Sequence, residues 1–169
     1  PTSLLTLAVL MRTYVRYADA FPPLDRLIAD SEAPDWRLLF ARGAAYERLG
    51  DWARAEADLK AARELRPDEA DILNYLAYGW IDRGENLEEA MAMVEQAVAA
   101  NPRSGAMVDT LGWGYYRLGQ YDKAVETLER AVELEAGDPE INNHLGDAYW
   151  QVGRRDEALF QWRRVLTLE

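Results

Sequence analysis

Apolar residues recur along the chain at intervals of three and four positions. One such stripe contains Leu73, Leu76, Ala77 and Trp80, which follow the spacing i, i+3, i+4, i+7. In an α-helix this spacing places all four side chains on one face. A similar stripe begins at Ala124 and continues over the following two turns. The pattern therefore predicts a series of amphipathic α-helices.

The helical pattern repeats with a nearly constant period. The segment Val108–Tyr115 matches Asn142–Tyr149, which lies 34 residues later, and Leu73–Trp80, which lies 35 residues earlier. A glycine and then an alanine follow at matching offsets in every unit: Gly50, Gly84, Gly119 and Gly153, then Ala55, Ala90, Ala124 and Ala158. One unit of this length cannot bury its own apolar stripe, so neighbouring units are expected to stack.

These positions resemble the tetratricopeptide repeat, which has a small residue at position 8, an aromatic residue at position 11, a helix-ending glycine near position 15 and an alanine at position 20. The resemblance implies an all-α fold, a right-handed superhelical solenoid of helix-turn-helix units with a concave inner surface. We expect four repeats, at residues 36–69, 70–104, 105–138 and 139–169. Residues 1–35 are expected to form a degenerate repeat or an N-terminal cap, and the whole chain one continuous domain.

The charge balance narrows the class of partner. The chain has 19 Lys and Arg residues against 30 Asp and Glu residues, which gives a formal net charge of −11 at pH 7. Because phosphate binding needs a concentrated cationic surface, a nucleic-acid ligand is not expected. The longest apolar run, Leu4–Met11, is too short to span a bilayer, so no membrane insertion by this segment is expected.

The sequence offers little material for catalysis. There is no cysteine, and His144 is the only histidine, so a thiolate nucleophile and a metal site built on several imidazoles or thiolates are excluded. Neither a nucleophile elbow nor a phosphate-binding loop is present. We therefore expect a non-catalytic protein with no cofactor and no metal, in which His144 has a structural or solvent-facing role.

Aromatic residues outside the packing positions indicate a binding surface. In tetratricopeptide repeats, positions 2, 5, 9, 12 and 13 of the first helix line the concave surface, and the resemblance places aromatic, amide and charged side chains there. The candidate partner-binding residues are Phe40, Arg48, Asn74, Tyr78, Asp109, Trp113, Tyr116, Arg117, Asn143, Asp147 and Trp150. Aromatic and Arg side chains are favoured at interface hot spots, and amides can bond a peptide backbone. The expected function is that of an adaptor that binds a peptide or helix of another protein.

Two alternatives follow from the same residues. Trp113 and Tyr116 can instead cover the seams between helices. The apolar ends, including the cluster at Leu4–Met11, can instead mediate self-assembly into a homo-oligomer.

The segments Leu73–Ala90 and Asn143–Trp150 also resemble those of long bacterial tetratricopeptide proteins, which are often envelope lipoproteins that act as assembly or protease adaptors. This resemblance favours the bacterial periplasm or envelope, with the cytoplasm as the alternative, although the sequence lacks a cysteine for lipid attachment.

Overall fold

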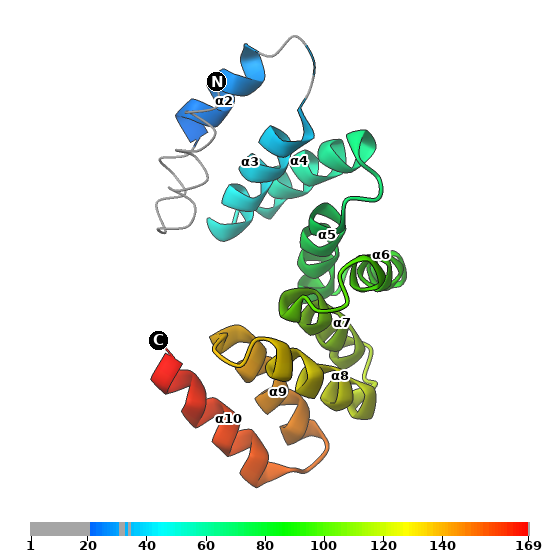
Figure 1. The fold of residues 1–169 in the computed structure, drawn as a ribbon, viewed down its shortest axis with the longest axis vertical. Helices are drawn as coiled ribbons and strands as arrows, with labels where there is room; N and C mark the ends of the chain where they lie inside the picture. The colour runs from blue at the N-terminus through cyan, green and yellow to red at the C-terminus, as the bar shows by residue number, and fades with distance from the viewer. Residues whose placement is uncertain (1–20, 31–32, 34, 169) are drawn as a thin grey trace. The chain divides into compact units, whose positions relative to one another are not determined.

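The computed structural model describes residues 21–30, 33 and 35–168. The regular elements of this part of the chain are all α-helices, so the predicted all-α fold of helix pairs is confirmed (Figure 1). The helices are α2 (Phe21–Ala29), α3 (Trp36–Arg48), α4 (Trp52–Leu65), α5 (Ala70–Arg83), α6 (Leu87–Ala100), α7 (Gly105–Arg117), α8 (Tyr121–Leu134), α9 (Pro139–Gln151) and α10 (Arg155–Leu168). Most of the expected degenerate repeat, including Leu4–Met11, lies outside the described residues.

Short polar side chains begin several of these helices. Asp35, Ser104 and Asp138 each precede a helix and accept a hydrogen bond from a backbone N–H of its first turn. Such caps satisfy backbone donors that have no partner inside the helix. At the other end, the glycine that follows α7, Gly119, has a φ of +73°, a left-handed conformation that suits glycine. These local signals explain why the helix pairs have tight, similar turns.

The chain divides into two compact units, residues 1–79 and 80–169, which we call the N-terminal and C-terminal units. Their boundary falls within α5. The helices α3 and α4 lie within 36–69, α7 and α8 within 105–138, and α9 and α10 within 139–169. The predicted repeat limits and the single continuous domain stay predictions.

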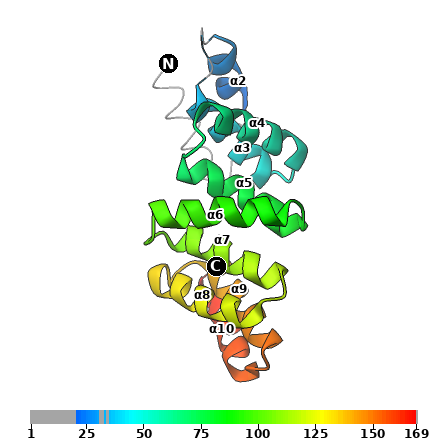
Figure 2. The same cartoon turned by 90° about the vertical axis from the view of Figure 1, so that its right-hand side faces the viewer.

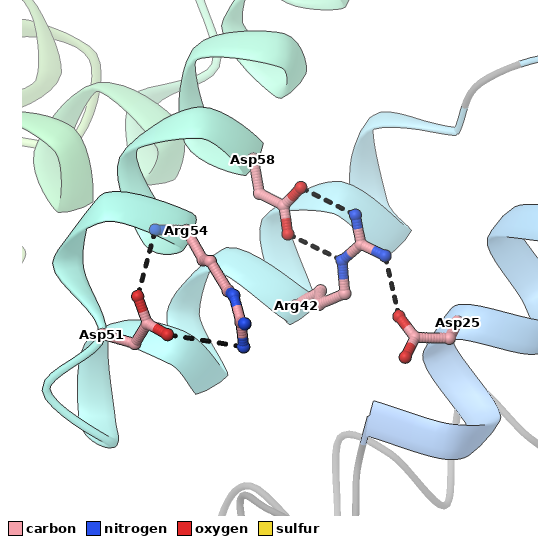
Figure 3. A network of polar contacts seen from close by, with 5 residues as sticks. All are labelled: Asp25, Arg42, Asp51, Arg54 and Asp58. Atoms are coloured by element: carbon pink, nitrogen blue, oxygen red, sulfur yellow. Dashed lines mark hydrogen bonds and ion pairs between the residues drawn. The ribbon is translucent and has the colours of Figure 1, made fainter.

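In the N-terminal unit, α2 packs on α3 through a small apolar cluster and a charged network. Leu24 of α2 contacts Leu38 and Ala41 of α3 in the core. Arg42 of α3 bonds both carboxylate oxygens of Asp58 in α4, at 2.7 and 2.9 Å, and its third nitrogen bonds Asp25 of α2 at 2.7 Å (Figure 3). One guanidinium thus joins three helices. Figure 3 also shows Asp51, the residue before α4, bonded to Arg54.

In the C-terminal unit, α6 packs against α7, α8 against α7 and α9, and α10 against α9 (Figure 2). The core between α8 and α9 contains Val125, Leu128, Leu145 and Ala148. Close approach within a pair depends on Gly112 of α7, because a Cβ there would lie 2.6 Å from Leu128 Cγ. This is the small residue expected at position 8.

Candidate functional site

The first helices of the last two pairs, α7 and α9, carry most of the candidate residues. In α7, Asp109, Trp113 and Tyr116 follow the spacing i, i+4, i+7 and share one face. In α9, Asn143 and Trp150 are seven residues apart, so these two side chains also share one face. We call the surface formed by these two faces the α7–α9 surface.

A buried ion pair lies at the base of this surface. Asp109 and His144 are only 5% and 6% exposed, and His144 Nδ1 lies 3.0 Å from each carboxylate oxygen of Asp109. Burial disfavours the imidazolium, but the hydrogen bond and the charge of Asp109 outweigh it and raise the pKa of His144 above its ordinary value. Burial raises the pKa of Asp109, and the hydrogen bond with His144 opposes that rise.

The imidazole of this ion pair is the first ring of a stack of three. Trp113 lies parallel to His144 with ring centroids 4.2 Å apart, and parallel to Tyr116 on its other side at 4.5 Å. The Tyr116 hydroxyl accepts a hydrogen bond from Gln151 Nε2 of α9 at 3.2 Å. Both Trp113 and Tyr116 are half-buried, so the stack joins α7 to α9 and also forms part of the surface.

Trp150 is the most exposed aromatic ring of this surface, at 41%. It contacts the Trp162 ring of α10 at 5.4 Å, and the Arg155 guanidinium lies 3.6 Å from its centroid. Trp162 Nε1 donates a hydrogen bond to Asp147 Oδ1 at 3.1 Å. Burial raises the pKa of Asp147, and this hydrogen bond opposes the rise. The side chains beneath Trp150 therefore hold it in one orientation.

The polar candidates of the C-terminal unit surround these rings. Asn143 and Arg117 are exposed, and Asp147 is half-buried. Arg117 Nη1 donates to the backbone carbonyl of Asp82. Asp109, in contrast, is buried against His144 and offers little surface to a partner.

The remaining four candidates lie in the N-terminal unit. Phe40 of α3 contacts the Tyr75 ring of α5 edge-on, with centroids 5.1 Å apart. Asn74 is buried, and its Oδ1 has no hydrogen-bond partner among the described residues. Tyr78 is half-buried and Arg48 is exposed. Whether any of the eleven residues contacts a partner stays a prediction.

The pairing of His144 with Asp109 was not anticipated. His144 was expected to be structural or solvent-facing, and it is buried. The signal in the sequence was a lone histidine at position 6 of one unit and an aspartate at position 5 of the preceding unit, 35 residues earlier. Trp162, which holds both Trp150 and Asp147, was assigned to packing alone.

The described residues show neither a metal-binding cluster nor a helix that could cross a bilayer. Within residues 21–30, 33 and 35–168, no group of three or more His, Asp or Glu side chains is placed so that it could hold a metal ion. In the same part of the chain, each helix is too short or too polar for a bilayer.

Comparison with known families agrees with the geometry. Models of the tetratricopeptide repeat match residues 36–69 and 139–169, and a model described as a TPR repeat matches residues 114–153. Together these matches cover more than half of the chain. The chain belongs to the tetratricopeptide repeat family.

A tetratricopeptide relative and several solved structures are similar to this chain. A TPR repeat-containing protein of Pseudomonas aeruginosa is 35% identical over 99 residues, which make up 59% of this chain and 17% of that protein. A thermophilic tetratricopeptide protein of Thermus thermophilus is 27% identical, with a TM-score of 0.81 over 99% of this chain and 90% of that one. MamA from Desulfovibrio magneticus RS-1 is 22% identical, with a TM-score of 0.75 over 99% and 93%, a likeness of fold.

Tetratricopeptide repeat proteins in general are scaffolds for protein–protein interaction and generally lack catalytic activity. The chain spans a small part of the length of its Pseudomonas relative.

Proposed function

We propose that this chain is a non-catalytic adaptor whose α7–α9 surface binds an extended or helical segment of another protein. The observations that carry the proposal are the exposed Trp150 ring of α9 and the stack of Tyr116, Trp113 and His144 that joins α7 to α9. Large rings at the centre of a surface are the residues that most often dominate protein–protein binding.

The aromatic side chains of this surface are held in place before any partner arrives. Trp113 is fixed between two rings, and Trp150 is fixed by Trp162 and Arg155. Binding a partner would therefore cost little side-chain entropy, because these rings already occupy one orientation. Preorganised rings support a binding role more strongly than exposed, mobile ones would.

Polar groups beside the rings support a peptide rather than a purely apolar ligand. Asn143 and Gln151 are exposed amides of α9, and Arg117 is an exposed cation of α7. Amides can donate to and accept from a peptide backbone, and Arg can pair with a carboxylate. The partner segment is expected to place an apolar side chain on Trp150 and its backbone along Asn143.

The test compares affinity capture from a bacterial lysate with the wild-type chain and with the double variant Trp150→Ala, Asn143→Ala. Phe160→Ala is the matched control, because Phe160 is an aromatic residue at 61% exposure on α10 and lies outside the α7–α9 surface. We expect a partner retained by wild type and by the control and lost by the double variant.

The purified partner should then bind the double variant at least about tenfold more weakly, by calorimetric titration. All three proteins must have the same helical circular dichroism spectrum. Equal affinity for the three would reject the α7–α9 surface as the binding site.

A further inference from the structure

The pair of Asp109 and His144 joins two helices through a group that can gain or lose a proton. Asp109 belongs to α7 and His144 to α9, and both side chains are almost fully buried. Because an ionised carboxylate only accepts hydrogen bonds, Nδ1 of His144 keeps its hydrogen, and the proton that is lost as pH rises comes from Nε2. The hydrogen bond between the helices therefore remains, and the charge of the pair changes.

Further carboxylates act on this pair. Glu140 and Asp147 of α9 favour the charged form of the His144 imidazole. Glu140 and Asp138, the residue before α9, disfavour the charge of Asp109. Once the imidazole is neutral, Asp109 has lost its cationic partner in a site with little water and still has these anions near it. Such a buried, uncompensated charge is costly in free energy.

A separate network links α9 to α8 and α10, which also pack against it. Glu129 of α8 accepts hydrogen bonds from the Tyr149 hydroxyl and from Arg154. Arg154 also bonds Glu157 of α10. The carboxylates that act on His144 belong instead to α7 and α9, the two helices that form the α7–α9 surface.

The stack of three rings connects the pair to the surface. Trp113 follows Asp109 by one turn of α7, and its ring lies 4.2 Å from that of His144. Nε1 of Trp113 is buried and has no hydrogen-bond partner among the described residues, so the stacking contacts position the indole. A charged imidazole attracts the face of an indole ring, and a neutral one lacks this attraction.

Loss of the imidazole charge thus weakens two contacts between α7 and α9 at once. One is the ion pair, and the other is the stacking of Trp113 on His144. Trp113 lies on α7, whereas Asn143 and Trp150 lie on α9, so the arrangement of the α7–α9 surface depends on how these two helices pack.

We propose that the protonation of His144 controls the α7–α9 surface, which binds its partner when the imidazole is charged and at least about fivefold more weakly when it is neutral. This inference rests on the adaptor function proposed above. It makes the surface a pH-dependent one, whose affinity falls as pH rises through the range in which His144 loses its proton.

The probe for this proposal is a peptide selected from a phage-displayed library of random peptides. Selection uses the wild-type chain, and peptides that also bind the double variant Trp150→Ala, Asn143→Ala are removed. A sequence without histidine or cysteine and with an acetylated N-terminus is chosen, so that the probe itself does not titrate between about pH 6 and about pH 9.

Calorimetric titration should show the probe binding wild type at least about fivefold more tightly at about pH 6 than at about pH 9. His144→Gln retains a donor for Asp109 but has no titratable proton, so its affinity should be the same at both pH values. Asp147→Asn is the matched control, because burial also raises the pKa of Asp147. This variant should keep the wild-type ratio of the two affinities. All chains must have the same helical circular dichroism spectrum at both pH values.

Nuclear magnetic resonance of the single histidine gives a second measurement, which needs no variant. The imidazole signals report the pKa of His144 with and without saturating probe. Because coupling between two binding events is reciprocal, a fivefold preference of the probe for the charged form should raise the pKa of His144 by about 0.7 on binding.

The outcomes separate this inference from the adaptor function. Equal affinity of wild type at the two pH values, a wild-type ratio in His144→Gln, or a pKa of His144 that the probe leaves unchanged would each overturn the inference. In these cases the probe still distinguishes wild type from the double variant, so the adaptor function stands. If no selected peptide distinguishes these two chains, the α7–α9 surface is not a peptide-binding surface and both proposals are wrong.

Discussion

Each unit ties neighbouring helices together with a charged network, but the two networks lie in different environments. In the N-terminal unit, Arg42 bonds Asp58 and Asp25 with a side chain that is 22% exposed. In the C-terminal unit, Asp109 and His144 are almost fully buried, and the indole ring of Trp113 stacks on the imidazole. Water can reach Arg42 and its partner Asp25, whereas it has little access to the ion pair of Asp109 and His144.

The two networks also differ in how they respond to pH. The carboxylates of Asp58 and Asp25 raise the pKa of Arg42 further above its already high value, so its charge is permanent in the physiological range. His144 is the one side chain of the C-terminal network whose type ordinarily changes charge close to physiological pH, and the hydrogen bond and charge of Asp109 raise its pKa above the ordinary value against the opposing effect of burial. The charge that joins neighbouring helices is therefore constant in the N-terminal unit and depends on pH in the C-terminal unit.

The largest expected effect on the free energy of unfolding follows from removing the buried carboxylate of Asp109. Asp109→Ala leaves His144 without its charged partner in a site with little water, and should lower the free energy of unfolding by about 3 kcal/mol. Urea unfolding followed by circular dichroism measures it. Glu133→Ala, an exposed carboxylate of α8, is the control and should change the free energy by less than about 0.5 kcal/mol. Similar values for the two would remove the contrast between buried and exposed sites.

The second effect is on the pH dependence of stability. A histidine whose pKa is raised by folding stabilises the protein fully below its ordinary value of 6.5, and that contribution is lost as pH rises through the folded pKa. Burial also raises the pKa of Asp109, so its contribution falls in the same direction, in a window that starts above 3.8. The free energy of unfolding should therefore fall as pH increases above 6.5.

His144→Gln should remove most of this decline between pH 6.5 and 9, and Arg42→Met should retain it. Urea titrations at a series of pH values provide the measurement. If His144→Gln keeps the full wild-type slope, the pH dependence does not come from this pair.

The third effect tests the N-terminal network. Arg42→Met keeps the apolar stem but leaves Asp58, which is buried, without its two hydrogen bonds. We expect a loss of about 1.5 kcal/mol in the free energy of unfolding, because hydrogen bonds to charged groups are worth more than neutral ones. A loss as large as that of Asp109→Ala would show that exposure does not distinguish the networks.

The smallest expected effect concerns the exposed ion pair between Asp25 and Arg42. Asp25 is 53% exposed, and its pair with Arg42 should contribute about 0.5 kcal/mol or less. Asp25→Asn should shift the urea midpoint slightly, and the shift should shrink further in 1 M salt, where the screening length is about 3 Å. A shift independent of salt would point to packing of α2 rather than charge.

The fold could be predicted from the sequence because the patterns that determine it are local and repeated. The stripe at Leu73 and the glycine at Gly119 each determine structure within one helix pair, and the period then places equivalent residues together. The surface was partly accessible by the same route, since Trp113 and Trp150 occupy positions of the first helices that the repeat assigns to its concave side.

The buried ion pair could not be predicted from the sequence because its two residues occupy non-equivalent positions of their repeats. Asp109 was placed on the surface by its position in the unit, yet its carboxylate is buried against His144. The difference of one position between the two residues rotates one side chain by about a quarter of a turn relative to the other. Which of them meet then depends on how α7 and α9 pack, which periodicity does not specify.

The stack of Trp113 on His144 has an optical consequence. Trp113 stacks on His144, so the protonated imidazole makes a cation–π contact with the indole. This contact quenches the fluorescence of Trp113. As pH rises and His144 loses its proton, Trp113 should become brighter while the other five tryptophans stay constant. The protein thus contains its own fluorescent indicator for the protonation of its single histidine.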